Sequence, residues 1–151
     1  MSKLNIFYVS VILLFNGCAH ASLEEGVVAG KKISLDTEKC LLTIDNKVLK
    51  IEMKKKCYFI KKSYPVTSEK EFGVYYYDNI DAHVLLIVGT SAPKNHPSHL
   101  SFTLGRDDCG EQRQVLIIKK ETASLYKVTD VGLICAGLGA DEKVYNILSR
   151  P

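Results

Sequence analysis

The stretch that decides the fold runs from Cys109 to Cys135 and reads CGEQRQVLIIKKETASLYKVTDVGLIC. An apolar run over Val115–Ile118 is followed by a polar bend over Lys119–Ser124 and a second run over Leu125–Val128. Short apolar runs that are rich in branched residues and separated by a polar bend predict a hairpin or two neighbouring β-strands. The cysteine at each end predicts that a disulfide staples the outer ends of this pair.

A second hairpin is predicted over Cys40–Ile44 and Lys47–Met53. The two residues between them, Asp45-Asn46, tolerate the positive φ angles of a two-residue type I′ turn. In the register that pairs Ile44 with Lys47, one face of the hairpin is mainly apolar and the other is mixed. The apolar face contains Cys40, Leu42, Ile44, Leu49, Ile51 and Met53.

The other predicted strands are short and regularly spaced: Ile33–Thr37, Cys57–Lys61, Phe72–Tyr77, Ala82–Gly89, Leu100–Leu104 and Val144–Leu148. Ala82–Gly89 is almost wholly apolar, which predicts a central strand buried on both faces. No long helical period occurs in the chain. The predicted fold class is therefore all-β, an antiparallel β-sandwich or small barrel of about eight short strands, stapled by two disulfides.

The first 21 residues predict a signal peptide. Lys3 precedes an apolar stretch over Leu4–Phe15, which is too short to span a bilayer. Ala19-His20-Ala21 then has the small-x-small form that places a cleavage site before Ser22. The alternative is a lipoprotein signal over residues 1–17 with Cys18 lipidated, since Gly17 precedes that cysteine.

After cleavage, residues 22–37 are predicted to be a linker with an edge strand, and residues 38–151 a single β-rich domain. The expected location is periplasmic or secreted, in a bacterial cell envelope. With Cys18 lipidated, the protein would be an outer-membrane lipoprotein.

The cysteine count supports export. Of the five cysteines, Cys18 falls in the leader region, which leaves four. An even number in an exported chain predicts a disulfide framework, and four cysteines allow three connectivities. The shortest loops favour Cys40–Cys57 and Cys109–Cys135, each stabilising the fold by roughly 3 kcal/mol. No Cys-x-x-Cys spacing occurs, so zinc is not expected.

The charge balance is mild. Twenty basic and 17 acidic residues give a net charge of +3, which argues against a dedicated nucleic-acid binder. Lysines gather between positions 47 and 62, opposed only by Glu52, and they are Lys47, Lys50, Lys54, Lys55, Lys56, Lys61 and Lys62. This run predicts an anionic partner such as an acidic protein surface, a lipid head group or a glycan. The alternative is a solubilising edge.

Two further features are candidates for partner contact. Side chains alternate along Tyr75-Tyr76-Tyr77, so at least one ring faces away from the core. The loop from Lys94 to His99 contains Pro97 and two histidines. The predicted partner-binding residues are Lys54, Lys55, Lys56, Tyr75, Tyr77, His96 and His99.

Catalytic patterns are weak. His83 has no nucleophile beside it in the sequence, and no Gly-x-Ser-x-Gly motif occurs. The acidic group around Asp107 and Asp108 has the composition of a tight turn and lacks a periodic calcium loop. The sequence therefore predicts no catalytic residue, no cofactor and no metal site.

The expected function is that of an exported, non-enzymatic binding protein, an inhibitor- or immunity-like partner of another protein. One alternative is an envelope lipoprotein that binds an anionic lipid or glycan. A further alternative is a metal-assisted hydrolase built on His96, His99 and Asp108.

Overall fold

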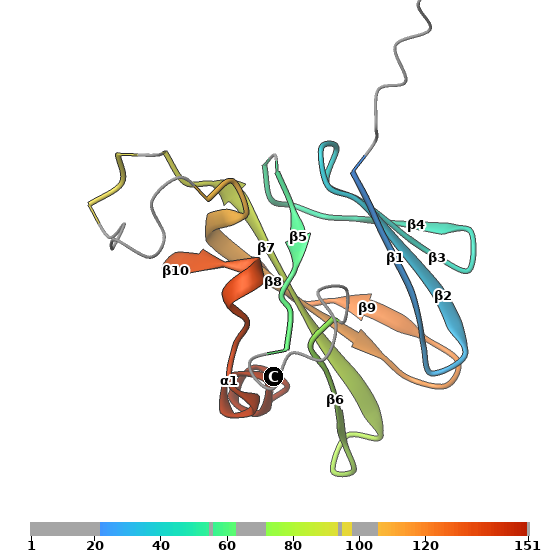
Figure 1. Ribbon diagram of the computed structural model, residues 1–151. Coiled ribbons are helices and arrows are strands. Elements are labelled where there is room, and N and C mark those ends of the chain that lie inside the picture. The colour runs from blue at the N-terminus through green and yellow to red at the C-terminus, as the bar shows by residue number, and fades with distance from the viewer. Residues whose placement is uncertain (1–21, 55, 63–71, 94, 98–105, 151) are drawn as a thin grey trace, which may run out of the picture.

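The computed structural model describes residues 22–54, 56–62, 72–93, 95–97 and 106–150. In this part of the chain, two antiparallel sheets are followed by a 3₁₀ turn and one α-helix (Figure 1). The four-stranded sheet has the order β1-β2-β3-β4, and its strands are β1 (Leu23–Val28), β2 (Lys31–Asp36), β3 (Leu41–Ile44) and β4 (Lys47–Lys50).

The six-stranded sheet is built on two ten-residue strands, β7 (Ala82–Ser91) and β8 (Cys109–Ile118). Both β5 (Tyr58–Phe59) and β6 (Val74–Tyr77) pair with β7, at its C-terminal and N-terminal halves respectively. On the other side, β9 (Ala123–Leu125) and β10 (Thr129–Cys135) both pair with β8. The predicted sandwich is confirmed, and within the described residues the two sheets do not close into a barrel.

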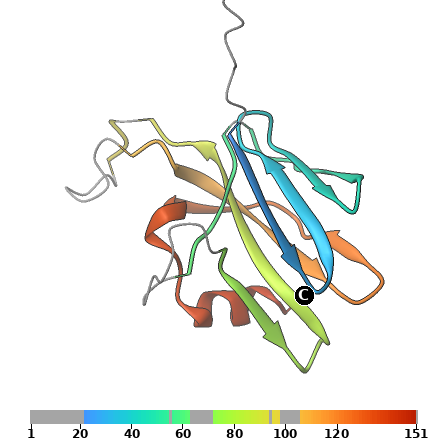
Figure 2. The ribbon, with the colours of Figure 1, turned by 45° about the vertical axis from the view of Figure 1, so that its right-hand side comes forward.

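Strand β7 is buried on both faces, as its sequence predicts. One core lies between the two sheets and contains Leu85 and Ile87 of β7 with Leu35 and Leu42 of the four-stranded sheet. A second core lies on the opposite face of β7, where Val84 and its neighbours pack against the C-terminal segment. Figure 2 shows this third layer on the side of β7 away from β1 and β2.

The β3–β4 hairpin has the predicted register. Ile44 pairs with Lys47 and Leu42 with Leu49, and Asp45 and Asn46 have φ angles of 47° and 66°. Leu42 and Ile44 are buried, whereas Leu41 and Val48 on the other face are exposed. This hairpin therefore places one face of β4 on the core and leaves the other face in solvent.

The pair predicted within Cys109–Cys135 differs in detail. The turn is tighter than expected, since the Lys119 N–H donates to the Thr122 carbonyl at 2.8 Å, and β9 ends at Leu125. The outer strand paired with the start of β8 is β10, in which Cys135 lies opposite Cys109. Both disulfides have the expected partners, Cys40–Cys57 and Cys109–Cys135.

Two segment predictions are wrong. The linker expected before Ile33 forms β1, which makes β1 rather than β2 the edge of its sheet. The strand expected over Val144–Leu148 is instead helix α1 (Glu142–Leu148), after a 3₁₀ turn, η1 (Ala136–Leu138). The Asp141 carboxylate caps α1 by accepting from the Lys143 N–H, which stabilises the first helical turn.

The strand predicted over Leu100–Leu104 and the leader over residues 1–21 lie outside the described residues. Within the part of the chain that is described, no helix has the length and apolar character needed to cross a membrane.

Candidate partner-binding surface

A bend over residues 51–57 connects β4 to β5 and contains the predicted lysines. Three hydrogen bonds fasten it to the end of β7, and a fourth fastens it to β8. The Thr90 N–H donates to the Lys54 carbonyl at 2.8 Å, and the Lys54 N–H donates to Thr90 Oγ1 at 3.2 Å. The Lys56 N–H donates to Ser91 Oγ at 2.7 Å, and the Glu52 N–H to Gln114 Oε1 at 3.3 Å. The backbone at Glu52, Lys54 and Lys56 is therefore held in place independently of the lysine side chains.

The Cys40–Cys57 disulfide anchors the same bend to the start of β3. Its position depends on Gly89 of β7, because a Cβ there would come within 2.8 Å of Cys57 Sγ. Gly89 thus lets β7 pass directly beneath the disulfide.

Thr90 has a strained backbone. Its φ angle is 57°, a value that a β-branched residue rarely adopts. The regular pairing of β7 with β8 is interrupted here, between Gly89 and Ser91. The Thr90 hydroxyl also donates to Gln112 Oε1 at 2.6 Å. Surrounding contacts must hold such a conformation, and strained residues of this kind gather at functional sites.

The lysines of this region differ in how they are paired. Lys56 Nζ lies 3.0 Å from Glu38 Oε1, and this hydrogen bond raises the pKa of Lys56. Lys54 is exposed and forms no salt bridge within the described part of the chain, and the same holds for Lys47 and Lys50 of β4. Lys55 lies outside the described residues. Three ammonium groups are thus available to an anionic partner.

The segment after β7 lies beside this bend. The Ala92 N–H donates to the Cys109 carbonyl at 3.0 Å, and His96 Nε2 lies 3.4 Å from Glu111 Oε1. The structure therefore brings His96 to the same end of β7 as Lys54 and Lys56. Lys94 and His99 lie outside the described residues.

The tyrosines are elsewhere. Strand β6 pairs with the start of β7, at the opposite end from the lysine bend (Figure 1). Tyr77 is only 6% exposed, and its hydroxyl donates to the Glu142 carbonyl at 3.1 Å. Burial raises the pKa of Tyr77 to about 12. The expectation that Tyr77 is a surface contact is wrong, because α1 covers its face of the sheet.

Tyr75 is half-buried and packs against Tyr145 of α1, with ring centroids 4.6 Å apart. Tyr76 is the exposed member of the three, at 50%, and its hydroxyl donates to Asp81 at 2.8 Å. His83 is half-buried, and its ring lies 5.0 Å from that of Tyr76.

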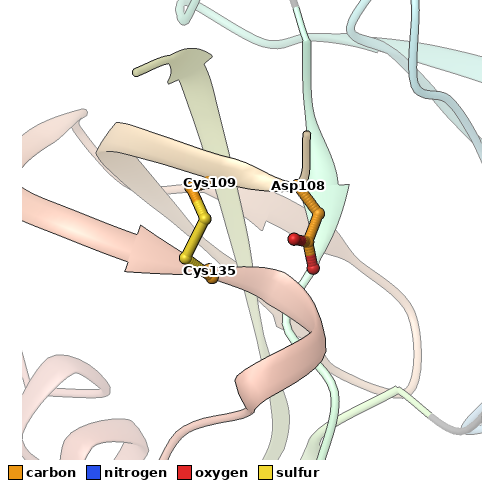
Figure 3. A group of neighbouring side chains, drawn as sticks. All are labelled: Asp108, Cys109 and Cys135. Atoms are coloured by element: carbon orange, nitrogen blue, oxygen red, sulfur yellow. A yellow bond between two sulfur atoms is a disulfide. The ribbon is translucent and has the colours of Figure 1, made fainter. Parts of the chain in front are cut away.

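Asp108, Cys109 and Cys135 lie close together and have atoms of the kinds that bind metals (Figure 3). The two sulfur atoms, however, are joined in a disulfide. The Asp108 carboxylate accepts from Arg106 Nε at 2.8 Å, from Arg106 Nη2 at 2.7 Å and from the Gly137 N–H at 2.6 Å. The disulfide and the Asp108 hydrogen bonds connect the start of β8 and the residues before it to the end of β10 and to η1. We therefore assign this cluster a structural role.

This arrangement bears on the hydrolase alternative. Burial raises the pKa of Asp108, but the Arg106 guanidinium and the Gly137 N–H outweigh it and lower the pKa overall. Both carboxylate oxygens are already bound, which leaves Asp108 poorly placed to serve as a metal ligand beside His96.

The free edge of β4, with Lys47 and Lys50, was not among the residues chosen from the sequence as a binding site. The sequence did contain a signal for this edge, because Lys47 and Lys50 belong to the lysine run between positions 47 and 62. Comparisons with protein-family models, curated proteins and solved structures found no match. A function must therefore be inferred from the chain's own residues.

Proposed function

We propose that this protein is an exported, non-enzymatic binding protein that acts as an inhibitor- or immunity-like partner of another protein. Its contact surface is centred on the Lys54–Lys56 bend and includes His96. The observation that carries this proposal is the fixed backbone of the bend, held by Thr90, Ser91 and a disulfide. A contact surface that is ordered before binding loses little conformational entropy in the complex.

Two disulfides in a chain of this size indicate an oxidising compartment. Export to a bacterial periplasm or beyond fits this chemistry and the apolar leader. Attachment through a lipidated Cys18 would leave the domain facing the same compartment. The partner is therefore sought among envelope or secreted proteins with an acidic surface.

The test is affinity capture from an envelope extract, with the oxidised protein as bait. We expect one protein to be retained in stoichiometric amount, and Lys54→Glu to weaken the retention about tenfold. Lys143→Glu on α1 makes the same charge change far from the bend and should leave retention unchanged. An equal loss in both variants, or retention only by anionic lipid vesicles, would contradict the proposal.

A further inference from the structure

Strand β4 is the last strand of its sheet, and no strand of the described chain pairs with its outer side (Figure 1). Ile44 and Lys47 close a two-residue turn, which makes them a hydrogen-bonded pair. Hydrogen-bonded and non-hydrogen-bonded positions alternate along an antiparallel pair. The N–H and C=O groups of Val48 and Lys50 therefore point away from β3, toward the open side.

This open edge is short and has a defined end. The next residue in the outward-facing series after Val48 and Lys50 is Glu52, and its N–H donates to the Gln114 side chain. Gln114 is buried and also donates to the Tyr126 carbonyl at 2.9 Å. The edge available to another strand is thus limited to the four residues of β4.

The side chains of β4 offer contacts on both faces of an added strand. On the outer face, Val48 is 61% exposed and lies near Leu41, which is 40% exposed. On the inner face, Leu49 and Lys47 line a groove of about 270 Å³ against Glu121–Ala123.

Charge selects the occupant. The order of β4 is Lys-Val-Leu-Lys, and neither lysine forms a salt bridge within the described chain. A second copy added antiparallel would pair the outward-facing positions Val48 and Lys50 with one another, and this places no carboxylate opposite either lysine. A segment with the order acidic, apolar, apolar, acidic would instead place a carboxylate opposite each lysine.

We propose that the free edge of β4 binds an extended acidic segment of a partner protein by β-strand addition. Main-chain hydrogen bonds to Val48 and Lys50 give affinity, and the flanking lysines select the sequence. This inference rests on the proposed function and names how the partner is held. The Lys54–Lys56 bend continues directly from β4, so both surfaces can contact one partner.

The probe is the synthetic peptide Thr-Glu-Val-Val-Glu-Thr, titrated into the oxidised protein and followed by amide NMR spectra. We expect the Val48 and Lys50 amide signals to shift and their hydrogen exchange to slow about tenfold. The matched peptide Thr-Lys-Val-Val-Lys-Thr should bind at least tenfold more weakly.

Val48→Pro removes one outward N–H and is tolerated at a strand edge. We expect it to weaken binding of the acidic peptide about tenfold, whereas Val48→Thr keeps the N–H and should lose threefold or less. If Val48→Pro fails to fold, the double reversal Lys47→Glu/Lys50→Glu replaces it. That variant should prefer the basic peptide.

Unchanged Val48 and Lys50 signals at millimolar acidic peptide, or equal binding of both peptides, would overturn strand addition. If capture of the partner protein still depends on Lys54, the proposed function is supported, and the partner is then bound by a contact other than strand addition at β4. If the acidic peptide binds at β4 but no partner is captured from the extract, strand addition at β4 is supported. The role in partner binding that is assigned to the bend is then overturned.

Discussion

Thr90 and Lys54 form a reciprocal pair: the Thr90 N–H donates to the Lys54 carbonyl, and the Lys54 N–H donates to the Thr90 hydroxyl. This pair joins the end of β7, a ten-residue strand buried on both faces, to the bend that contains the exposed Lys54. The strained φ angle of Thr90 is the local cost of the arrangement.

Replacing Thr90 tests that pair. Thr90→Val keeps the β-branched strain and removes the hydroxyl, so it should lower the free energy of unfolding by about 1–3 kcal/mol. Thr90→Ser keeps the hydroxyl and should lose less than about 1 kcal/mol. Urea denaturation measures both. Equal losses would mean that the hydroxyl contributes nothing to the bend.

Helix α1 is held by Tyr145, whose ring is completely buried and lies over Gly73. A Cβ at Gly73 would come within 2.8 Å of Tyr145 Cζ, so Gly73→Ala should cost about 1–3 kcal/mol by overpacking. Thermal and urea unfolding check this value. A cost below about 0.5 kcal/mol would contradict the tight packing of α1 on β6.

The Tyr145 hydroxyl has no hydrogen-bond partner among the described residues. Tyr145→Phe should therefore be neutral or should stabilise the fold by about 1 kcal/mol, because it removes an unsatisfied buried group. It should also reduce the cost of Gly73→Ala, and a double-mutant cycle measures that coupling. Additive effects would contradict the contact.

The two disulfides should differ in what they support. Removing either pair by double alanine substitution is expected to cost about 3 kcal/mol, since the sequence separations are 17 and 26 residues. Cys40→Ala/Cys57→Ala should in addition weaken partner capture more strongly, because Cys57 directly follows Lys56. Equal capture by both variants would contradict a role for this cross-link in ordering the bend.

Acid should weaken the fold through Asp108. Its pKa in the folded protein lies below the ordinary value of 3.8, so the folded state binds this proton less tightly than the unfolded chain. The resulting stability is complete above pH 3.8 and is lost as the pH falls from 3.8 through the lower folded value.

Asp108→Asn should therefore cost about 1–2 kcal/mol at neutral pH and should flatten the dependence of stability on pH below 4. Unfolding measured between pH 2 and 7 checks this, with Asp78→Asn in an exposed turn as the control. If the free energy of unfolding of Asp108→Asn depends on pH as it does in the original protein, Asp108 is not the group that weakens the fold in acid.

The sequence predicted those elements whose pattern is local. The β3–β4 register follows from Asp45-Asn46 and the alternation around it, and the burial of β7 follows from its continuous apolar run. The disulfide partners follow from loop lengths, although spacing alone leaves three connectivities open.

Other features depended on contacts distant in sequence. Val144, Tyr145 and Leu148 suit a helix face as well as a strand, and the capping Asp141 was the signal that separates the two. Because the helix was missed, the burial of Tyr77 was missed as well. The attachment of the lysine bend to Thr90 and Ser91 joins positions about 35 residues apart, which no local pattern reveals.

The most direct test of the central claim, an oxidised and exported binding scaffold, is the intact mass of the protein isolated from its native cells, followed by disulfide mapping. We expect a chain that begins at Ser22, or at a lipidated Cys18, with Cys40–Cys57 and Cys109–Cys135 linked and no free thiol among these four. A chain that retains residues 1–21 and has reduced cysteines would contradict it.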